Sequence, residues 1–118
     1  MDPAWKVKIT QITLCGGGNL THNSIASIGH HNPDIKINLL TRRPDAWNSE
    51  IISKTDGSPW IEKGPLVGKL NKVSNKPEEV VPGSQVLVIA GPACAHYEIL
   101  KKCEPYVDKG AFVGTVFG

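Results

Sequence analysis

The residues best suited to chemistry form a glycine-rich turn near the amino terminus. An apolar run over residues 7–15 leads directly into Gly16, Gly17, Gly18, Asn19, Leu20 and Thr21. This order matches the G-x-G-x-x-small pattern that follows the first strand of dinucleotide-binding folds. Gly16 permits a tight turn, Gly18 lets a pyrophosphate approach the backbone, and the N–H groups of Asn19 and Leu20 attract an anion. The alternative is a flexible turn that binds nothing.

A basic tripeptide ends the second apolar run, in the order Thr41, Arg42 and Arg43. Dinucleotide folds that use NAD carry an acidic residue at this place for the adenosine ribose, and none stands here. A guanidinium can instead pair with a 2′-phosphate, which favours NADP over NAD as the cofactor. The alternative is a solvated basic turn before Pro44, with Asp45 as its partner.

A third candidate turn follows the most hydrophobic run, over residues 85–90. It contains Pro92 and Ala93, with His96 in the first turn of the next helix. Ligands of open α/β sheets bind at such an edge, and a helix N-terminus favours the neutral imidazole. His96 therefore either lies beside the nicotinamide or serves only to satisfy the turn. Cys94 in the same turn is expected to be a packed residue rather than a reactive thiol.

Around these turns, short apolar runs alternate with helical patterns. Thr21, Ile25 and Ile28 form the apolar stripe of a helix that should end near Gly29. The runs at 36–40, 70–73, 85–90 and 111–116 predict further strands, the patterns at 44–47, 77–81 and 93–107 predict helices, and 51–55 with 60–63 predicts a hairpin around Asp56-Gly57. We expect an α/β, three-layer Rossmann-like domain with a mostly parallel five-stranded sheet and a small β-hairpin.

Composition limits the number of domains, the classes of binding partner and the cellular compartment that the sequence suits. The 118 residues suit one domain, and 13 basic and 11 acidic residues are scattered without a block that would indicate nucleic-acid or membrane binding. Three cysteines without a pairing pattern indicate a reducing compartment, so we expect a cytoplasmic protein. The spacing of histidines and cysteines predicts no metal site, and no catalytic residue is expected in this chain.

Three segments together resemble the opine (octopine/nopaline) dehydrogenases: Gly16 to Asn19 with His22, Leu40 to Arg43, and Pro92 to His96 leading into Pro105-Tyr106-Val107. The hairpin resembles that family too, whereas Thr21 and Gly91 depart from its pattern. The resemblance implies an NAD(P)-binding domain over residues 1–118, truncated before a C-terminal helical domain that carries the catalytic histidine. It implies reductive condensation of an amino acid with a 2-keto acid in the full-length dehydrogenase, and an inactive chain by itself.

Alternatives remain at this point. Ketopantoate reductases and glycerol-3-phosphate dehydrogenases share the same first half, so the cofactor class is firmer than the substrate class. A non-catalytic nucleotide-binding module and a protein-interaction scaffold are the other two interpretations. A truncated domain would leave a sheet edge and apolar surface exposed, which predicts self-association.

Overall fold

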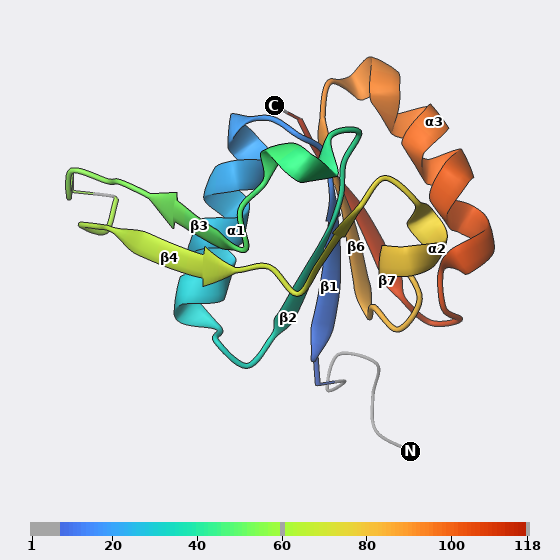
Figure 1. The fold of residues 1–118 in the computed structure, drawn as a ribbon, viewed down its shortest axis with the longest axis horizontal. Helices are drawn as coiled ribbons and strands as arrows, with labels where there is room; N and C mark the ends of the chain where they lie inside the picture. The colour runs from blue at the N-terminus through green and yellow to red at the C-terminus, as the bar shows by residue number, and fades with distance from the viewer. Residues whose placement is uncertain (1–7, 60, 118) are drawn as a thin grey trace.

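The computed structural model describes residues 8–59 and 61–117, which form a parallel sheet with helices on both faces and a hairpin to one side (Figure 1). The elements in chain order are β1 (Gln11–Cys15), α1 (Asn19–His31), β2 (Lys36–Leu40), η2 (Pro44–Ala46), β3 (Glu50–Ser53), β4 (Leu66–Lys69), β5 (Lys72–Ser74), α2 (Pro77–Val80), β6 (Val86–Gly91), α3 (Ala93–Cys103), η3 (Glu104–Tyr106) and β7 (Phe112–Phe117).

The sheet has five strands in the order β5-β2-β1-β6-β7, and every neighbouring pair runs parallel. The chain begins at the centre with β1, moves outward through β2 to β5, and then returns to the other side of β1 as β6. The order therefore reverses between β1 and β6, which is where open α/β sheets bind ligands at their carboxyl edge. The predicted three-layer α/β class with a five-stranded parallel sheet is confirmed.

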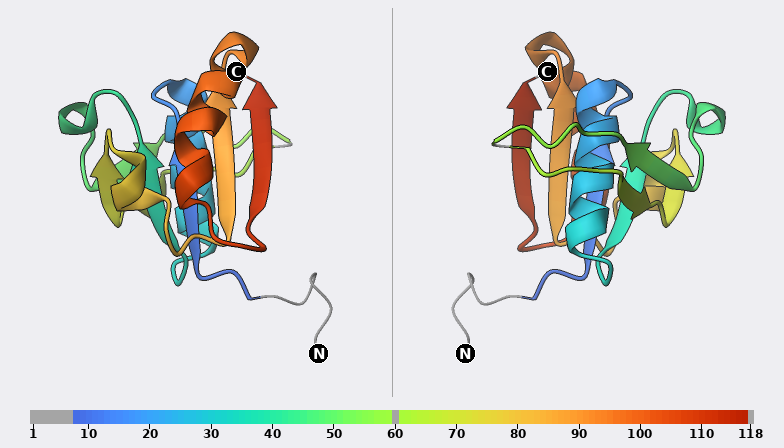
Figure 2. Two further views of the ribbon diagram at one scale, coloured as in Figure 1. Left: turned by 90° about the vertical axis from the view of Figure 1, so that its right-hand side faces the viewer. Right: turned by 90° about the vertical axis from the view of Figure 1, so that its left-hand side faces the viewer.

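Alternating side chains of the strands supply a separate core on each face of the sheet. Ile12 and Leu14 of β1 pack with Ile25 of α1 on the first face. Cys15, at the end of the same strand, packs with Cys103 of α3 on the second face. Figure 2 views the sheet from its two faces, with α3 in front of the strands in one view and α1 in front of them in the other, so the two helices lie on opposite faces.

The hairpin of β3 and β4 packs against α1 at two glycines. A Cβ at Gly68 would overlap the carbonyl oxygen of Ile25, and a Cβ at Gly29 would lie 2.6 Å from the Cα of Gly68. Such distances exclude any side chain, so the helix and the hairpin touch through their backbones. The first face therefore carries two layers, α1 and then the hairpin.

The prediction of which segment pairs with β3 in the hairpin was wrong. Glu50–Ser53 pairs antiparallel with Leu66–Lys69 and not with residues 61–63, and Trp60 of the predicted strand lies outside the described residues. Among the described residues of the intervening segment, an isolated bridge joins Asp56 and Lys63, the Thr55 hydroxyl donates to the Glu62 carbonyl, and Gly64 N–H donates to Thr55 O at 3.2 Å. β3 pairs with the segment that packs against α1. Burial of Leu66 and Gly68 there stabilises this pairing more than the Asp56-Gly57 turn stabilises pairing with the nearer segment.

Polar side chains line the second face around the end of α2. The Val80 carbonyl accepts hydrogen bonds from Thr13 Oγ1 at 2.6 Å and from Asn38 Nδ2 at 3.0 Å. Ser84 Oγ lies 2.7 Å from Thr13 Oγ1 and accepts from Gln11 Nε2 at 2.9 Å. Since the Thr13 hydroxyl donates to the Val80 carbonyl, the Ser84 hydroxyl donates to Thr13 Oγ1. Gln11, Ser84 and Thr13 therefore each donate to the next group, which ends at the Val80 carbonyl. These strand residues satisfy a carbonyl that the end of a helix leaves free.

Several boundaries differ from the predicted ones. The first strand begins at Gln11, and Val7 lies outside the described residues. Helix α1 continues beyond Gly29 to His31, α3 gives way to η3 after Cys103, and the third strand is Lys72–Ser74. In α3, Ile99 packs against the core of the second face, whereas Leu100 is exposed.

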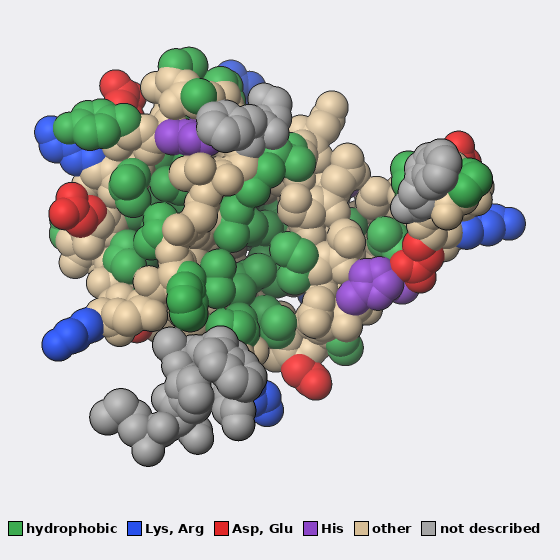
Figure 3. Space-filling model, turned by 180° about the vertical axis from the view of Figure 1, so that it is seen from behind, with side chains coloured by type: hydrophobic (Ala, Val, Ile, Leu, Met, Phe, Trp, Pro, Cys, Tyr) green, Lys and Arg blue, Asp and Glu red, His purple; other side chains and the backbone are tan. Residues whose placement is uncertain are grey.

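Strand β7 is one edge of the sheet, and apolar side chains stand uncovered along it. Phe112, Val113 and Val116 are exposed, as are Tyr97 and Leu100 of α3. Viewed from behind, hydrophobic side chains gather over the middle of the molecule (Figure 3). Within residues 8–59 and 61–117, no helix combines the length and the apolar character needed to cross a membrane.

Candidate functional site

Gly16 makes the first tight contact of the glycine turn. Its φ is +150°, and a Cβ there would lie 2.6 Å from both Ala90 O and Thr21 Oγ1. Its N–H donates to Leu40 O at 3.0 Å, so the residue is held between the ends of β2 and β6. The turn off β1 accordingly requires glycine at this position. Thr21 is buried against it, which explains how a threonine serves at the small-residue position.

Gly18 differs, because no contact among the described residues requires glycine there. Its backbone is extended, with φ −101° and ψ −168°, and, apart from its chain neighbours, no atom of the described residues would lie within 4 Å of a Cβ. It is the N-cap of α1, which has neither a capping side chain nor an acidic residue in its first turn. The N–H groups of Asn19 and Leu20 thus begin a thirteen-residue helix beside open space. This cradle fits a group that must approach the backbone closely, such as a pyrophosphate.

Thr41 joins the glycine turn to the second strand end. It is 8% exposed, its N–H donates to Ser74 O at 3.0 Å, and its Oγ1 would lie 3.2 Å from a Cβ on Gly17. Arg43 N–H donates to the same Oγ1 at 3.5 Å. The side chains of Arg42 and Arg43 are exposed, and in the described part of the chain neither forms an ion pair with Asp45 or with any other carboxylate.

A hollow of about 420 Å³ opens beside the glycine turn. His22 and Trp47 form its aromatic part, with ring centroids 6.1 Å apart, and His22 Nε2 lies 2.8 Å from Ile52 O. The hollow is lined by Gly17, Gly18, Asn19, His22, Ala46, Trp47, Asn48, Glu50, Ile51 and Ile52. His22 therefore links the first turn of α1 to the hairpin, and the glycine turn has an apolar flank.

The turn after β6 is short and internally bonded. Gly91 has φ +137°, Pro92 is the N-cap of α3, and Ala95 N–H donates to Pro92 O at 3.0 Å. His96 Nε2 lies 2.9 Å from Gly91 O, on a half-buried side chain. This contact agrees with a histidine that satisfies the turn, whereas a place beside the nicotinamide stays a prediction. Pro92 and Ala93 are exposed at the sheet edge.

The three thiols are free and have different surroundings. Cys94 is exposed in the first turn of α3, contrary to the expectation that it packs. Cys15 and Cys103 are buried together between the second face of the sheet and α3. A hydrogen bond with Cys103, together with burial, raises the pKa of the Cys15 thiol far above its usual range. Cys15 therefore contributes to packing and not to chemistry.

The fold brings the three predicted turns together. Each one follows the carboxyl end of a parallel strand, and β2, β1 and β6 are neighbours in the sheet. Two further residues, Trp47 and Lys76, lie near this edge and were not among the predicted site residues. Trp47 follows η2 and Lys76 follows β5. A signal for Lys76 existed, because it stands directly before a proline-initiated helix after a predicted strand.

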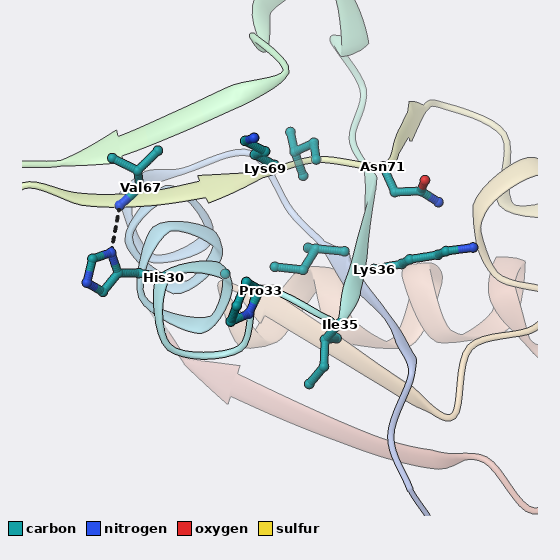
Figure 4. A pocket seen from close by; sticks show the side chains of 10 residues that line it. His30, Pro33, Ile35, Lys36, Val67, Lys69 and Asn71 are labelled. Carbon is teal, nitrogen blue, oxygen red and sulfur yellow. Dashed lines mark hydrogen bonds between the residues drawn. The ribbon is translucent and has the colours of Figure 1, made fainter.

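A second hollow, of about 400 Å³, lies at the opposite edge of the sheet (Figure 4). Its centre is apolar, with Pro33 and Ile35, while the side chains of Lys36 and Asn71 point away from it. His30 Nδ1 accepts a hydrogen bond from Val67 N–H at 3.5 Å at the rim. Among the described residues, no three histidine, cysteine or carboxylate side chains cluster as a metal site would require.

Comparisons with known proteins agree with this architecture. No family model matches the chain. It is 32% identical over 112 residues to opine dehydrogenase from Haliotis discus hannai and 33% identical over 109 residues to tauropine dehydrogenase from Arabella iricolor. Each match covers 86% of this chain, and the chain spans 27% of the length of each relative.

The fold recurs in solved structures. Octopine dehydrogenase with NADH and pyruvate superimposes with a TM-score of 0.72 and 21% identity, over 88% of this chain and 28% of that one. A ketopantoate reductase from Staphylococcus aureus shares the fold with a TM-score of 0.57 and 9% identity, over 92% and 33% of the two chains. The resemblance of this chain to the N-terminal domain of the opine dehydrogenases is therefore confirmed.

Proposed function

We propose that this chain is the dinucleotide-binding domain of an opine-dehydrogenase-like oxidoreductase. The single observation that carries the proposal is the open cradle at Gly18, which lies beside the N-terminus of α1 at the edge where the strand order reverses. A glycine that no protein contact requires, at a helix start without a capping side chain, suits a bound pyrophosphate. The named relatives are dehydrogenases, which supports the same chemistry.

Each of the three turns is proposed to contact a different part of the dinucleotide. Gly16, Gly17, Gly18, Asn19 and Leu20 hold the pyrophosphate, and the lining of the hollow by Gly17, Gly18 and Asn19 supports this share. Thr41, Arg42 and Arg43 hold the adenosine ribose and its substituent. Pro92, Ala93 and His96 border the nicotinamide half, which supplies the hydride when it is bound. The chain itself binds and orients the dinucleotide, and we place the reacting substrate on a following helical domain.

The cofactor is NAD or NADP, and we favour NADP. Arg42 and Arg43 are exposed at the end of β2, without an ion-pair partner among the described residues and without an acidic residue at the ribose position. A guanidinium there suits a 2′-phosphate. The octopine dehydrogenase structure holds NADH, and the titration below distinguishes the two cofactors.

In the full-length protein we propose reductive condensation of an amino acid with a 2-keto acid. This chain corresponds to about a quarter of the relatives' length, so the substrate site would come from outside it.

We also propose that residues 1–118 associate with a second copy through the uncovered β7 edge, where Phe112, Val113 and Val116 are exposed. Three free cysteines fit a cytosolic location.

The test is calorimetric titration of the purified chain with NADH and NADPH. Gly18→Val should abolish binding of both, because the new side chain fills the cradle. Gly114→Val is a matched control, since a Cβ on Gly114 of β7 likewise meets no atom of the described residues within 4 Å, and this variant should leave binding unchanged. Circular dichroism verifies that both variants fold. Retained binding in Gly18→Val would remove the basis of the proposal.

A further inference from the structure

We propose that Lys76 is a third cationic arm of a 2′-phosphate subsite, together with Arg42 and Arg43. The inference rests on the proposed dinucleotide function. It adds to the cofactor site a residue that follows β5, whereas Arg42 and Arg43 follow β2. The ligand class is a nucleotide that carries a phosphate on its adenosine 2′-oxygen. Lys76 would then distinguish NADPH from NADH.

The sheet register brings Lys76 to the same edge as the arginines. Strands β2 and β5 pair parallel with Leu40 opposite Ser74, and Thr41 N–H donates to Ser74 O at 3.0 Å. Extending this register by two positions sets Lys76 beside Arg42. Both residues therefore leave the sheet at its carboxyl edge, next to the glycine turn that Thr41 contacts.

Hydrogen bonds fix the backbone of Lys76. Its N–H donates to Ser74 Oγ at 3.0 Å, and Ser74 Oγ donates to Glu79 Oε2 at 2.6 Å. Ser74 is 6% exposed, so the turn is anchored in the body of the sheet. Pro77 then starts α2 and restrains the conformation of Lys76 itself. An anchored backbone lowers the entropy lost when the side chain meets a ligand.

The charge at this edge is uncompensated. Arg42, Arg43 and Lys76 are all exposed, and within the described ranges none of them lies within ion-pair distance of a carboxylate. Of the two acids that follow Lys76, Glu79 bonds to Ser74, and Glu78 is exposed and forms no ion pair within the described ranges. Three cations from two adjacent strands beside a pyrophosphate cradle suit a second phosphate, which accepts several charge-assisted hydrogen bonds.

The experiment is titration of the 118-residue chain with 2′,5′-ADP and with 5′-ADP, followed by NADPH and NADH. We expect 2′,5′-ADP to bind more tightly than 5′-ADP. Lys76→Ala should weaken 2′,5′-ADP and NADPH about tenfold, the loss of one charge-assisted contact, and leave 5′-ADP and NADH unchanged. Lys76→Arg should restore most of the affinity.

The matched control is Lys72→Ala, which removes the same charge at the other end of β5, where the residue is also exposed. It should leave all four affinities unchanged. Equal losses in Lys72→Ala and Lys76→Ala, or no preference for 2′,5′-ADP in the unaltered chain, would overturn the subsite while NADH binding still supports the proposed function. Failure of every nucleotide to bind the folded chain overturns both.

Discussion

The two faces of the sheet are built from alternating residues of the same strands, yet they are stabilised differently. On the first face Ile12, Leu14 and their neighbours meet α1 and the hairpin in a continuous apolar cluster. On the second face, beside an apolar cluster around Cys15 and Leu87, Thr13 and Asn38 bond the Val80 carbonyl. A thirteen-residue helix covers the first face, whereas a four-residue helix covers this part of the second.

The difference shows how a short helix changes what its sheet must provide. A four-residue helix buries little apolar surface and brings the free carbonyls of its end close to the strands. Polar strand residues then replace apolar ones, because an unpaired buried carbonyl costs more than a bonded one. Thr13 and Asn38 are therefore structural, although buried polar side chains in a central strand resemble a functional site.

The largest expected effect is on the first face. Gly68→Val should destabilise the chain by more than about 3 kcal/mol, because its side chain would overlap the Ile25 and Ala26 backbone, which cannot move aside. Urea unfolding followed by circular dichroism measures the loss. Gly114→Ala on the open β7 strand is the control and should change stability by less than about 0.5 kcal/mol. Similar stabilities of the two variants would show that α1 and the hairpin do not interlock.

A core truncation should cost slightly less. Leu14→Ala removes a 1% exposed side chain from the apolar cluster and should destabilise by about 3 kcal/mol. The same urea unfolding experiment applies, with Leu14→Met as a volume-conserving control that loses under about 1.5 kcal/mol. A loss as small as that control would mean that the first face is loosely packed.

The polar face predicts a smaller and coupled effect. Thr13→Val keeps the shape but removes the donor to Val80 O, and we expect a loss of about 1–2 kcal/mol. Ser84→Ala should couple to it by about 1 kcal/mol in a double-mutant cycle, since the two hydroxyls bond each other. Thr115→Val, at an exposed position of β7, is the control and should change stability by less than about 0.5 kcal/mol. Strict additivity would indicate that the hydroxyls do not form one network.

The smallest perturbation is chemical labelling of the thiols. Ellman's reagent should modify one thiol rapidly in the folded chain, Cys94, because Cys15 and Cys103 are 1% and 0% exposed. The raised pKa of Cys15 also keeps it protonated near neutral pH. All three should react in urea, and Cys94→Ser should remove the fast phase. Rapid reaction of a second thiol would show that the second face opens readily.

Local patterns were sufficient for most of this architecture. The apolar runs, the Gly16 turn and the stripe of Thr21 and Ile25 specify strands and a helix through nearby residues alone. The partner of β3 was not predictable in that way, because its pairing depends on Gly68 meeting Gly29 from a distant segment. Likewise Lys76 stood apart from Arg42 in sequence, and only the pairing of β2 with β5 brings them to one edge.

The division into two cores also bears on synthesis at the ribosome. The buried members of the first cluster all lie between Ile12 and Leu66, and β1, β2 and β5 are complete at Ser74. The second cluster needs Val80, Leu87 and Cys103, which emerge later. A nascent chain can therefore assemble α1, the hairpin and three strands first, and β6 then docks along the free side of β1. We therefore expect the pairing of β1 with β6, which joins Ile12 to Val86, to form after the first cluster has assembled.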